Sequence, residues 1–179
     1  MHLIRASGRL ACVLSALISC GCALRDVHSF AERGFDPARY HTYRWAPADD
    51  RATGDPRLDD NPFFQRSVQT AVESELAKRG FEKTTSETAD LVIDYYAHVT
   101  QRVERAGADL VYRSCTDCRP YVYDAGSLMI DLVEGRTRAL LWRGWAEGDI
   151  SGLIDNQSWL EERIGQAVAR ILERLPRGV

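Results

Sequence analysis

Ala125-Gly-Ser-Leu-Met-Ile-Asp-Leu-Val-Glu-Gly-Arg-Thr-Arg-Ala-Leu-Leu-Trp-Arg-Gly-Trp-Ala-Glu-Gly148 is the stretch that decides the fold. Two largely apolar runs flank Glu134, Gly135 and Arg136, and a glycine can supply the positive φ that a tight reversal needs. Apolar side chains alternate with other residues along both runs, first Leu128, Ile130 and Leu132, then Leu140 and Trp142. The stretch therefore predicts a β-hairpin with one apolar face, on which helices can pack.

Two amphipathic helices are predicted, one before and one after this hairpin. The first follows the capping sequence Asp60-Asn61-Pro62 and ends at Gly80, where a left-handed residue commonly closes a helix. The second begins at Ser158, with Glu161 at the capping-box spacing, and ends before Pro176. Their apolar stripes are Phe64, Val68, Ala71, Val72 and Leu76 in the first, and Leu160, Ile164, Ala167, Val168, Ile171, Leu172 and Leu175 in the second.

Further strands are predicted outside the hairpin. Residues 89–103 alternate cleanly, residues 40–45 are rich in aromatic and β-branched side chains, and residues 27–30 give a weak strand signal. Residues 48–61 are interpreted as a surface loop and residues 104–124 as irregular. The element order predicts an α+β fold, a two-layer sandwich with a mixed, mostly antiparallel sheet of four to five strands and two helices on one face.

Composition limits the classes of function. The chain has 179 residues, 45% of them hydrophobic and 27% charged, with a formal net charge of -3. It shows no basic stripe, so nucleic acid is not an expected partner. It contains no nucleophile elbow, zinc-protease motif, phosphate-binding loop or dinucleotide fingerprint. We therefore expect no enzyme activity, no cofactor and no metal.

The N-terminal residues have the layout of a secretory signal. Arg5 and Arg9 precede an apolar stretch over residues 10–18. The sequence Leu17-Ile18-Ser19-Cys20 resembles the lipobox of bacterial lipoproteins, which implies that Cys20 is acylated after removal of residues 1–19. Cys22 is the alternative acylation site. Residues 20–36 then form a lipidated N-terminus, a tether and a possible first strand, and residues 37–179 form a single α+β domain.

Ordered sequence blocks over residues 26–176 resemble the 4136 family of domains of unknown function. The blocks are Phe35-Asp36, Tyr40-His41-Thr42-Tyr43-Arg44-Trp45, Asn61-Pro62, Leu76-Ala77-Lys78-Arg79-Gly80-Phe81, Ala89-Asp90-Leu91, Gly126-Ser127-Leu128, Leu141-Trp142-Arg143-Gly144 and Leu175-Pro176. This resemblance implies a lipid-anchored envelope protein of a Gram-negative bacterium. It does not imply a particular enzymatic reaction. Gly21 rather than Asp after Cys20 is similar to outer-membrane sorting signals, which implies the periplasmic face of the outer membrane.

Cys115 and Cys118 form a Cys-x-x-Cys pair that departs from the family pattern. In an oxidising envelope we expect a small loop-closing disulfide. Free thiols and a metal site completed by His98 or His41 remain alternatives. A metal- or thiol-dependent enzyme built on these two cysteines is the corresponding alternative function.

A set of side chains is predicted to point away from the helices: Tyr96, His98, Met129, Arg143 and Trp145. Such residues are enriched at protein interfaces, so they form a candidate partner-binding patch, with packing against neighbouring strands as the alternative. The leading hypothesis is a non-catalytic, lipid-anchored binding or structural module of the envelope. Trp142 and Tyr95 support a third hypothesis, a carrier of a small apolar ligand between sheet and helices.

Overall fold

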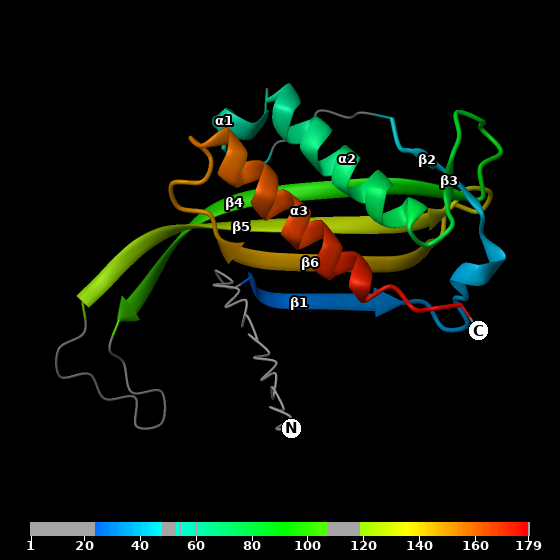
Figure 1. Cartoon of the computed structure of the whole chain (residues 1–179). Helices are drawn as coiled ribbons and strands as arrows, with labels where there is room; N and C mark the ends of the chain where they lie inside the picture. Colours follow the sequence, from blue (N-terminus) through cyan, green and yellow to red (C-terminus); the bar gives the residue numbers. More distant parts are fainter. Residues whose placement is uncertain (1–23, 48–52, 54, 60, 107–118, 179) are drawn as a thin grey trace, which may run out of the picture.

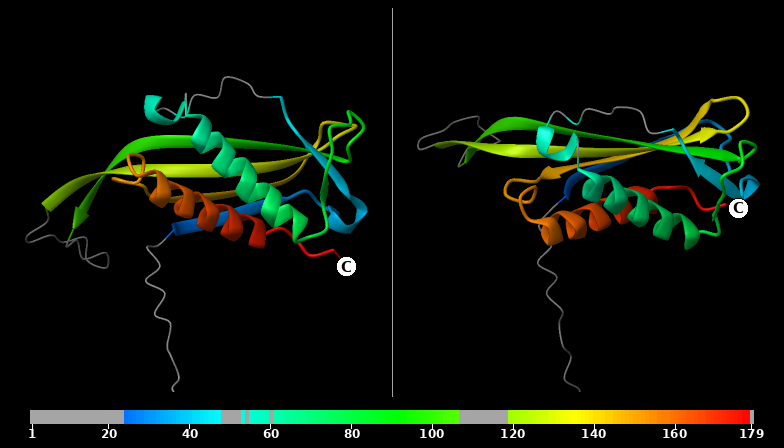
Figure 2. Two further views of the ribbon diagram at one scale, coloured as in Figure 1. Left: turned by 45° about the horizontal axis from the view of Figure 1, so that its top comes forward. Right: turned by 90° about the horizontal axis from the view of Figure 1, so that it is seen from above.

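The computed structural model describes residues 24–47, 53, 55–59, 61–106 and 119–178. Two layers form the molecule, with a twisted sheet on one side and two long helices on the other (Figures 1 and 2). In chain order the elements are β1 (Leu24–Ala31), a 3-10 helix (Pro37–Arg39), β2 (Thr42–Trp45), α1 (Pro56–Asp59), α2 (Pro62–Ala77), β3 (Glu82–Lys83), β4 (Leu91–Ala106), β5 (Arg119–Glu134), β6 (Leu140–Asp149) and α3 (Gln157–Glu173).

The sheet has six strands in the order β1-β6-β5-β4-β2-β3. β2 runs parallel to β3 and β4, and the other neighbours are antiparallel. The predicted α+β fold with a mixed sheet and both long helices on one face is therefore confirmed. The expected strand number of four to five is too low, because β1 extends one edge of the sheet and the two-residue β3 extends the other.

Both long helices are capped by asparagine. The Asn61 side chain accepts hydrogen bonds from the backbone N–H groups of Phe63 and Phe64 at 3.0 and 3.2 Å, before Pro62 opens α2. Gly80 has a φ of 84°, as predicted for the residue that ends this helix. The predicted start of the second helix at Ser158 is wrong. Asn156 caps α3 instead, because its side chain accepts from the N–H of Trp159 at 3.1 Å.

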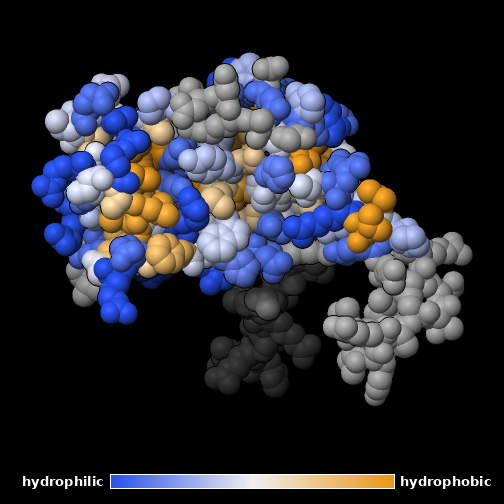
Figure 3. Space-filling model, turned by 180° about the vertical axis from the view of Figure 1, so that it is seen from behind, coloured by the Kyte–Doolittle hydropathy of each residue, from blue (hydrophilic) through white to orange (hydrophobic). Residues whose placement is uncertain are grey.

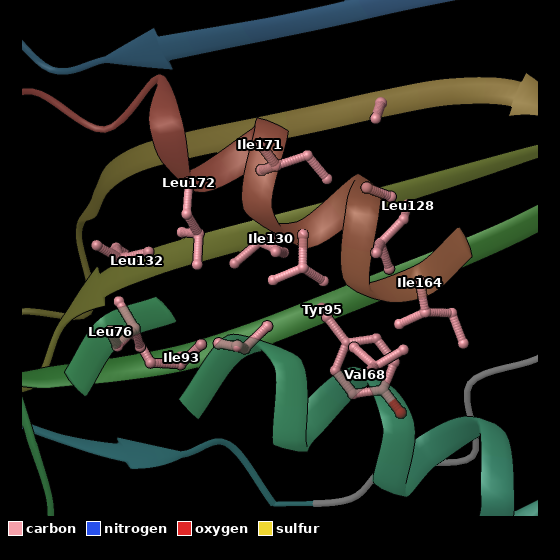
Figure 4. Packing of buried hydrophobic residues seen from close by; sticks show 14 of the residues in the cluster. Val68, Leu76, Ile93, Tyr95, Leu128, Ile130, Leu132, Ile164, Ile171 and Leu172 are labelled. Atoms are coloured by element: carbon pink, nitrogen blue, oxygen red, sulfur yellow. The ribbon is translucent and has the colours of Figure 1, made fainter. Parts of the chain in front are cut away.

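The core lies between the sheet and the two helices. Val68 and Leu76 from α2 and Ile164, Ile171 and Leu172 from α3 meet apolar side chains of β4 and β5 (Figure 4). The strand contributors labelled there are Ile93, Tyr95, Leu128, Ile130 and Leu132. Each such side chain contributes about 1.5 to 3 kcal/mol when it leaves water. Both helical stripes are thus the main source of stability, although Ala71 is only partly buried.

The turn of the central hairpin lies where the sequence predicts it, but the role of Gly135 is different. The positive φ of 64° belongs to Arg138 rather than to Gly135. Glycine is required at position 135 because a Cβ there would lie 2.0 Å from the carbonyl oxygen of Ala89. Its N–H donates to the carbonyl of Asp90 at 2.8 Å, so the turn packs against the start of β4.

An irregularity in the β5–β6 ladder changes the faces of the return strand. Leu132 lies opposite Trp142, whereas the next residue, Val133, lies opposite Leu140. Leu140 and Trp142 therefore project to opposite faces, not to the one apolar face that simple alternation predicts.

Two segments interpreted as loops carry structure. Residues 104–124 are not irregular at their ends, because β4 continues to Ala106 and β5 begins at Arg119. Residues 101–106 and 119–124 pair with each other beyond the last residue of β6, which lies opposite Ala125. We call this two-stranded extension the arm. Within the predicted surface loop 48–61, Leu58 is buried and the carbonyl of Thr53 accepts from the N–H of Val99 at 2.7 Å.

The carboxylate of Asp90 joins the start of β2 to the start of β4. It accepts hydrogen bonds from the N–H groups of His41 and Thr42, both at 2.9 Å, and from the Thr42 hydroxyl at 3.0 Å. These backbone donors, that of Thr42 most strongly, hold the pKa of Asp90 below its usual value.

We expect Asp90→Asn to lower the free energy of unfolding at pH 7 by about 1 to 2 kcal/mol, because a charged acceptor of three hydrogen bonds is lost. The folded pKa of Asp90 is depressed, so its contribution is complete above the unfolded pKa of about 3.9 and is lost as the pH falls through the lower folded value. Urea unfolding between pH 3 and 7 should show a smaller loss of stability on acidification in the variant. The exposed Asp26→Asn is the control, and equal pH profiles for wild type and Asp90→Asn would contradict the assignment.

Candidate binding surface on the open face of the sheet

Strand register brings the predicted patch residues together on the face of the sheet opposite the helices. Tyr96 lies opposite Met129, Met129 opposite Trp145, and Trp145 opposite His28. We call these four residues the open-face row. Neighbouring rows on the same face place Arg143 beside Phe30 and Asp131, and His98 beside Ser127. All five predicted residues thus share one face and lie in three adjacent rows.

The open-face row is accessible and aromatic. Tyr96 is 45% exposed, and its hydroxyl donates to the carboxylate of Asp94 at 3.0 Å. The imidazole of His28 stacks on the indole of Trp145, with ring centroids 5.4 Å apart and planes at 28°. Met129 and Trp145 are half-buried, while His28 and His98 are exposed. The pairing fixes the rings in place and leaves one side of the row open to a partner.

Arg143 has a structural contact that residue pattern alone does not show. Its Nε and Nη2 atoms donate to the two carboxylate oxygens of Asp131 at 2.7 and 2.6 Å. The hydrogen bond to Asp131 raises the pKa of the Arg143 guanidinium. Asp131 is only 4% exposed, so Arg143 neutralises a carboxylate that the sheet buries. Asp131 therefore holds the Arg143 side chain in place, and only part of the guanidinium is available to a partner.

Sequence reasoning missed two members of this surface, His28 and Phe30. Both come from β1, whose strand signal is weak, although Asp26, His28 and Phe30 do alternate with smaller or apolar residues. Polar groups surround the row: Arg102 pairs with Glu147 at 3.0 Å, and Asp26 and Asp94 lie nearby in register. Seen from this side, hydrophilic and apolar residues are interspersed across the molecule (Figure 3).

The residues that suggested a ligand carrier belong to the core. Trp142 is fully buried, and Tyr95 packs edge-on against Trp45 with ring centroids 6.1 Å apart. An apolar cavity between sheet and helices measures about 70 Å³, and neither Trp142 nor Tyr95 lines it. A wider recess of about 560 Å³ lies at the other end of the molecule, between the 3-10 helix and the ends of α2 and α3. His41, one of the two histidines named as a possible metal ligand, lines this recess, and the residues of the predicted partner-binding patch do not.

Cys20, Cys22, Cys115 and Cys118 lie outside the described residues. Across the part of the chain that the structure describes, no three His, Cys, Asp or Glu side chains group as metal ligands. Within that same part, no helix is long and apolar enough to cross a membrane.

The fold and this face define a class: a single α+β sandwich whose sheet leaves one side open and lined with aromatic, polar and paired charged residues. The chain belongs to the DUF4136 family, a domain of unknown function, whose sequence model matches residues 27–177. A search of curated proteins found no match.

Solved structures share the fold at low sequence identity. A PDZ domain protein from Parabacteroides distasonis superposes with a TM-score of 0.53 at 13% identity over 86% of this chain, which spans 36% of that protein. The PelC dodecamer from Paraburkholderia phytofirmans gives 0.50 at 12% identity, with coverage of 86% of this chain and 99% of that one. A DUF4136 family protein from Bacteroides thetaiotaomicron gives 0.49 at 13% identity over 78% of this chain and 91% of the other.

Proposed function

We propose that the chain is a non-catalytic, lipid-anchored protein at the periplasmic face of the outer membrane of a Gram-negative bacterium. Its folded domain binds another envelope protein through the open-face row. The observation that carries the proposal is the alignment of His28, Trp145, Met129 and Tyr96 across four strands on a face that neither long helix covers.

The chemistry of the row suits a protein partner. Aromatic residues and methionine are enriched at the centres of protein interfaces, where a few of them supply most of the binding energy. The pairs Arg143–Asp131 and Arg102–Glu147 surround the row with satisfied charges, which favour specificity more than affinity. The partner surface should therefore offer an apolar centre with hydrogen-bonding groups at its rim.

The anchor supports the location. The lipobox-like sequence ending at Cys20 supplies acyl chains, and several chains together hold a protein stably at a bilayer, because each buried CH2 contributes roughly 0.8 kcal/mol. A domain held at the membrane meets envelope partners at high effective concentration, so a modest interface suffices.

We expect Tyr96→Ala with Trp145→Ala to reduce capture of the partner by at least about tenfold, since two central aromatic contacts are lost. The measurement is photo-crosslinking in intact cells from a reactive residue at position 129, with crosslinked bands quantified and identified. Trp159→Ala, an exposed tryptophan on α3, is the matched control and should leave the bands unchanged. The Cys20→Ser chain should lose both radiolabelled palmitate and the crosslinks.

Each part of this experiment can fail separately. Unchanged crosslinks in the double variant would overturn the role of the open-face row. Palmitate that remains after Cys20→Ser would move the anchor to another residue, and a chain without any label would overturn the membrane location.

A further inference from the structure

We propose that the arm rests on the same lipid bilayer that holds the N-terminal anchor, so that the domain contacts the membrane at two points. This inference rests on the proposed acylation of Cys20. The arm is formed by residues 101–106 of β4 and 119–124 of β5, which extend past the rest of the sheet (Figure 1).

The chain enters the sheet beside the base of the arm. Leu24 lies opposite Gly148, Gly148 opposite Gly126, and Gly126 opposite Val99, so these four residues form one row across the sheet. The arm begins two residues further along β4. Three strand spacings of about 4.8 Å place the entry point about 14 Å from the base of the arm.

The tether is short. Four peptide steps separate Cys20 from Leu24. Even a fully extended chain covers at most about 3.6 Å per residue, which is about 14 Å in total. An acylated Cys20 therefore holds this end of the sheet close to the bilayer surface, while the six residues of each arm strand reach about 20 Å beyond the row.

Exposed apolar side chains gather at this end. Among the residues that the structure describes, Val103 is 67% and Val122 is 61% exposed, and the two lie directly opposite each other in the arm. Trp159, 58% exposed, lies in the first turn of α3, and the next residue, Leu160, lines a cavity with Val99 and Gly126 at the arm base. From behind, a group of strongly apolar residues stands out at this end (Figure 3).

The remaining face of the arm suits the headgroup region. Tyr121 is also exposed, and the hydroxyls of Tyr121 and Tyr123 both donate to the carboxylate of Glu104 at 2.9 Å. Tyrosine and tryptophan favour the membrane interface, because an apolar ring and a polar end meet both environments there. The arm thus carries an exposed valine pair on one face and two amphipathic tyrosines on the other.

Hydrogen exchange of the acylated full-length mature chain tests the proposal. Intact mass first selects chain that carries acyl groups at Cys20, and absence of acylated chain would count against the anchor rather than against the arm. Exchange is then compared in phosphatidylethanolamine–phosphatidylglycerol vesicles and in detergent micelles. We expect amides of residues 101–106, 119 and 121–124 to exchange about tenfold more slowly in vesicles, with β1 and β6 unchanged.

Val103→Asp with Val122→Asp should abolish this slowing while the sheet exchanges as in wild type, because both side chains project into solvent. Thr70→Asp with Thr85→Asp, at two exposed positions outside the arm and the open face, adds the same charge as a control and should keep it. Equal exchange of the arm in vesicles and micelles would overturn the proposal. If the slowing of exchange in the arm increases with the amount of protein at constant lipid, the arm contacts a second copy of the chain, and the proposal is overturned.

Discussion

Trp142→Ala should lower the free energy of unfolding by about 3 to 5 kcal/mol, because it removes the largest fully buried side chain of the core. The ring of Trp142 lies over the backbone at Gly144, where an added Cβ would come within 2.3 Å of it and within 2.7 Å of Ile171. Strand and helix meet there without spare room, so truncation leaves a cavity that the structure cannot close. Urea unfolding followed by circular dichroism measures the effect.

Trp145→Ala, three residues further along β6 on the other face, is the matched control. Trp145 is half-buried and contacts His28 on a face that is open to solvent. Its loss should cost less than about 1 kcal/mol, as for most substitutions outside the core. Similar losses for the two tryptophans would contradict the assignment of Trp142 to the core and reopen a ligand-contacting role.

Arg143→Met should lower the free energy of unfolding by about 3 kcal/mol, because it leaves the carboxylate of Asp131 buried without its counter-ion. Asp131 is 4% exposed and receives two hydrogen bonds from the guanidinium. Methionine keeps most of the aliphatic stem, so the loss reports on charge and hydrogen bonding rather than on packing.

A double-mutant cycle with Asp131→Asn isolates the pair. Asp131→Asn in the Arg143→Met background should restore part of the lost stability, since burying an amide costs less free energy than burying an unpaired carboxylate. Additive losses would show that the two side chains do not stabilise each other. Because of this coupling, the binding role of the open face is tested at Tyr96 and Trp145 and not at Arg143.

Helices and core strands could be predicted because their signals are local. The stripe from Phe64 to Leu76 repeats at helical spacing, Asn61 and Gly80 mark the ends of that helix, and Leu91, Ile93 and Tyr95 alternate along a strand. The start of α3 could not be assigned correctly, because Asn156 and Ser158 both favour capping and only the helix path selects between them.

The arm and the edge strands escaped prediction for a different reason. Residues 101–106 and 119–124 pair without a core beneath most of their length, so burial imposes no alternation of apolar residues on them. β3 is two residues long and exists because residues 82–83 pass beside β2. β1 gave only a weak signal because it lies at the edge of the sheet, where few of its side chains are buried.

The candidate site was predicted in part. Tyr96, His98, Met129, Arg143 and Trp145 follow from strand alternation, which assigns each residue to a face once the helices are known to cover the other. Their alignment into rows, the stacking of His28 on Trp145 and the pairing of Arg143 with Asp131 depend on register between strands, which spacing within one strand does not contain.

The amino-acid sequence by itself determined the class of fold, the two helical stripes and the core-facing residues of β4 and β5, because these follow from periodicity along a single segment. Only the tertiary structure decided which residues stand opposite each other, why Gly135 is needed at the turn, and that the chain enters the sheet beside the base of the arm. These features arise from contacts between segments that are distant in sequence, where packing and hydrogen-bond geometry select one register among several that the residue pattern allows.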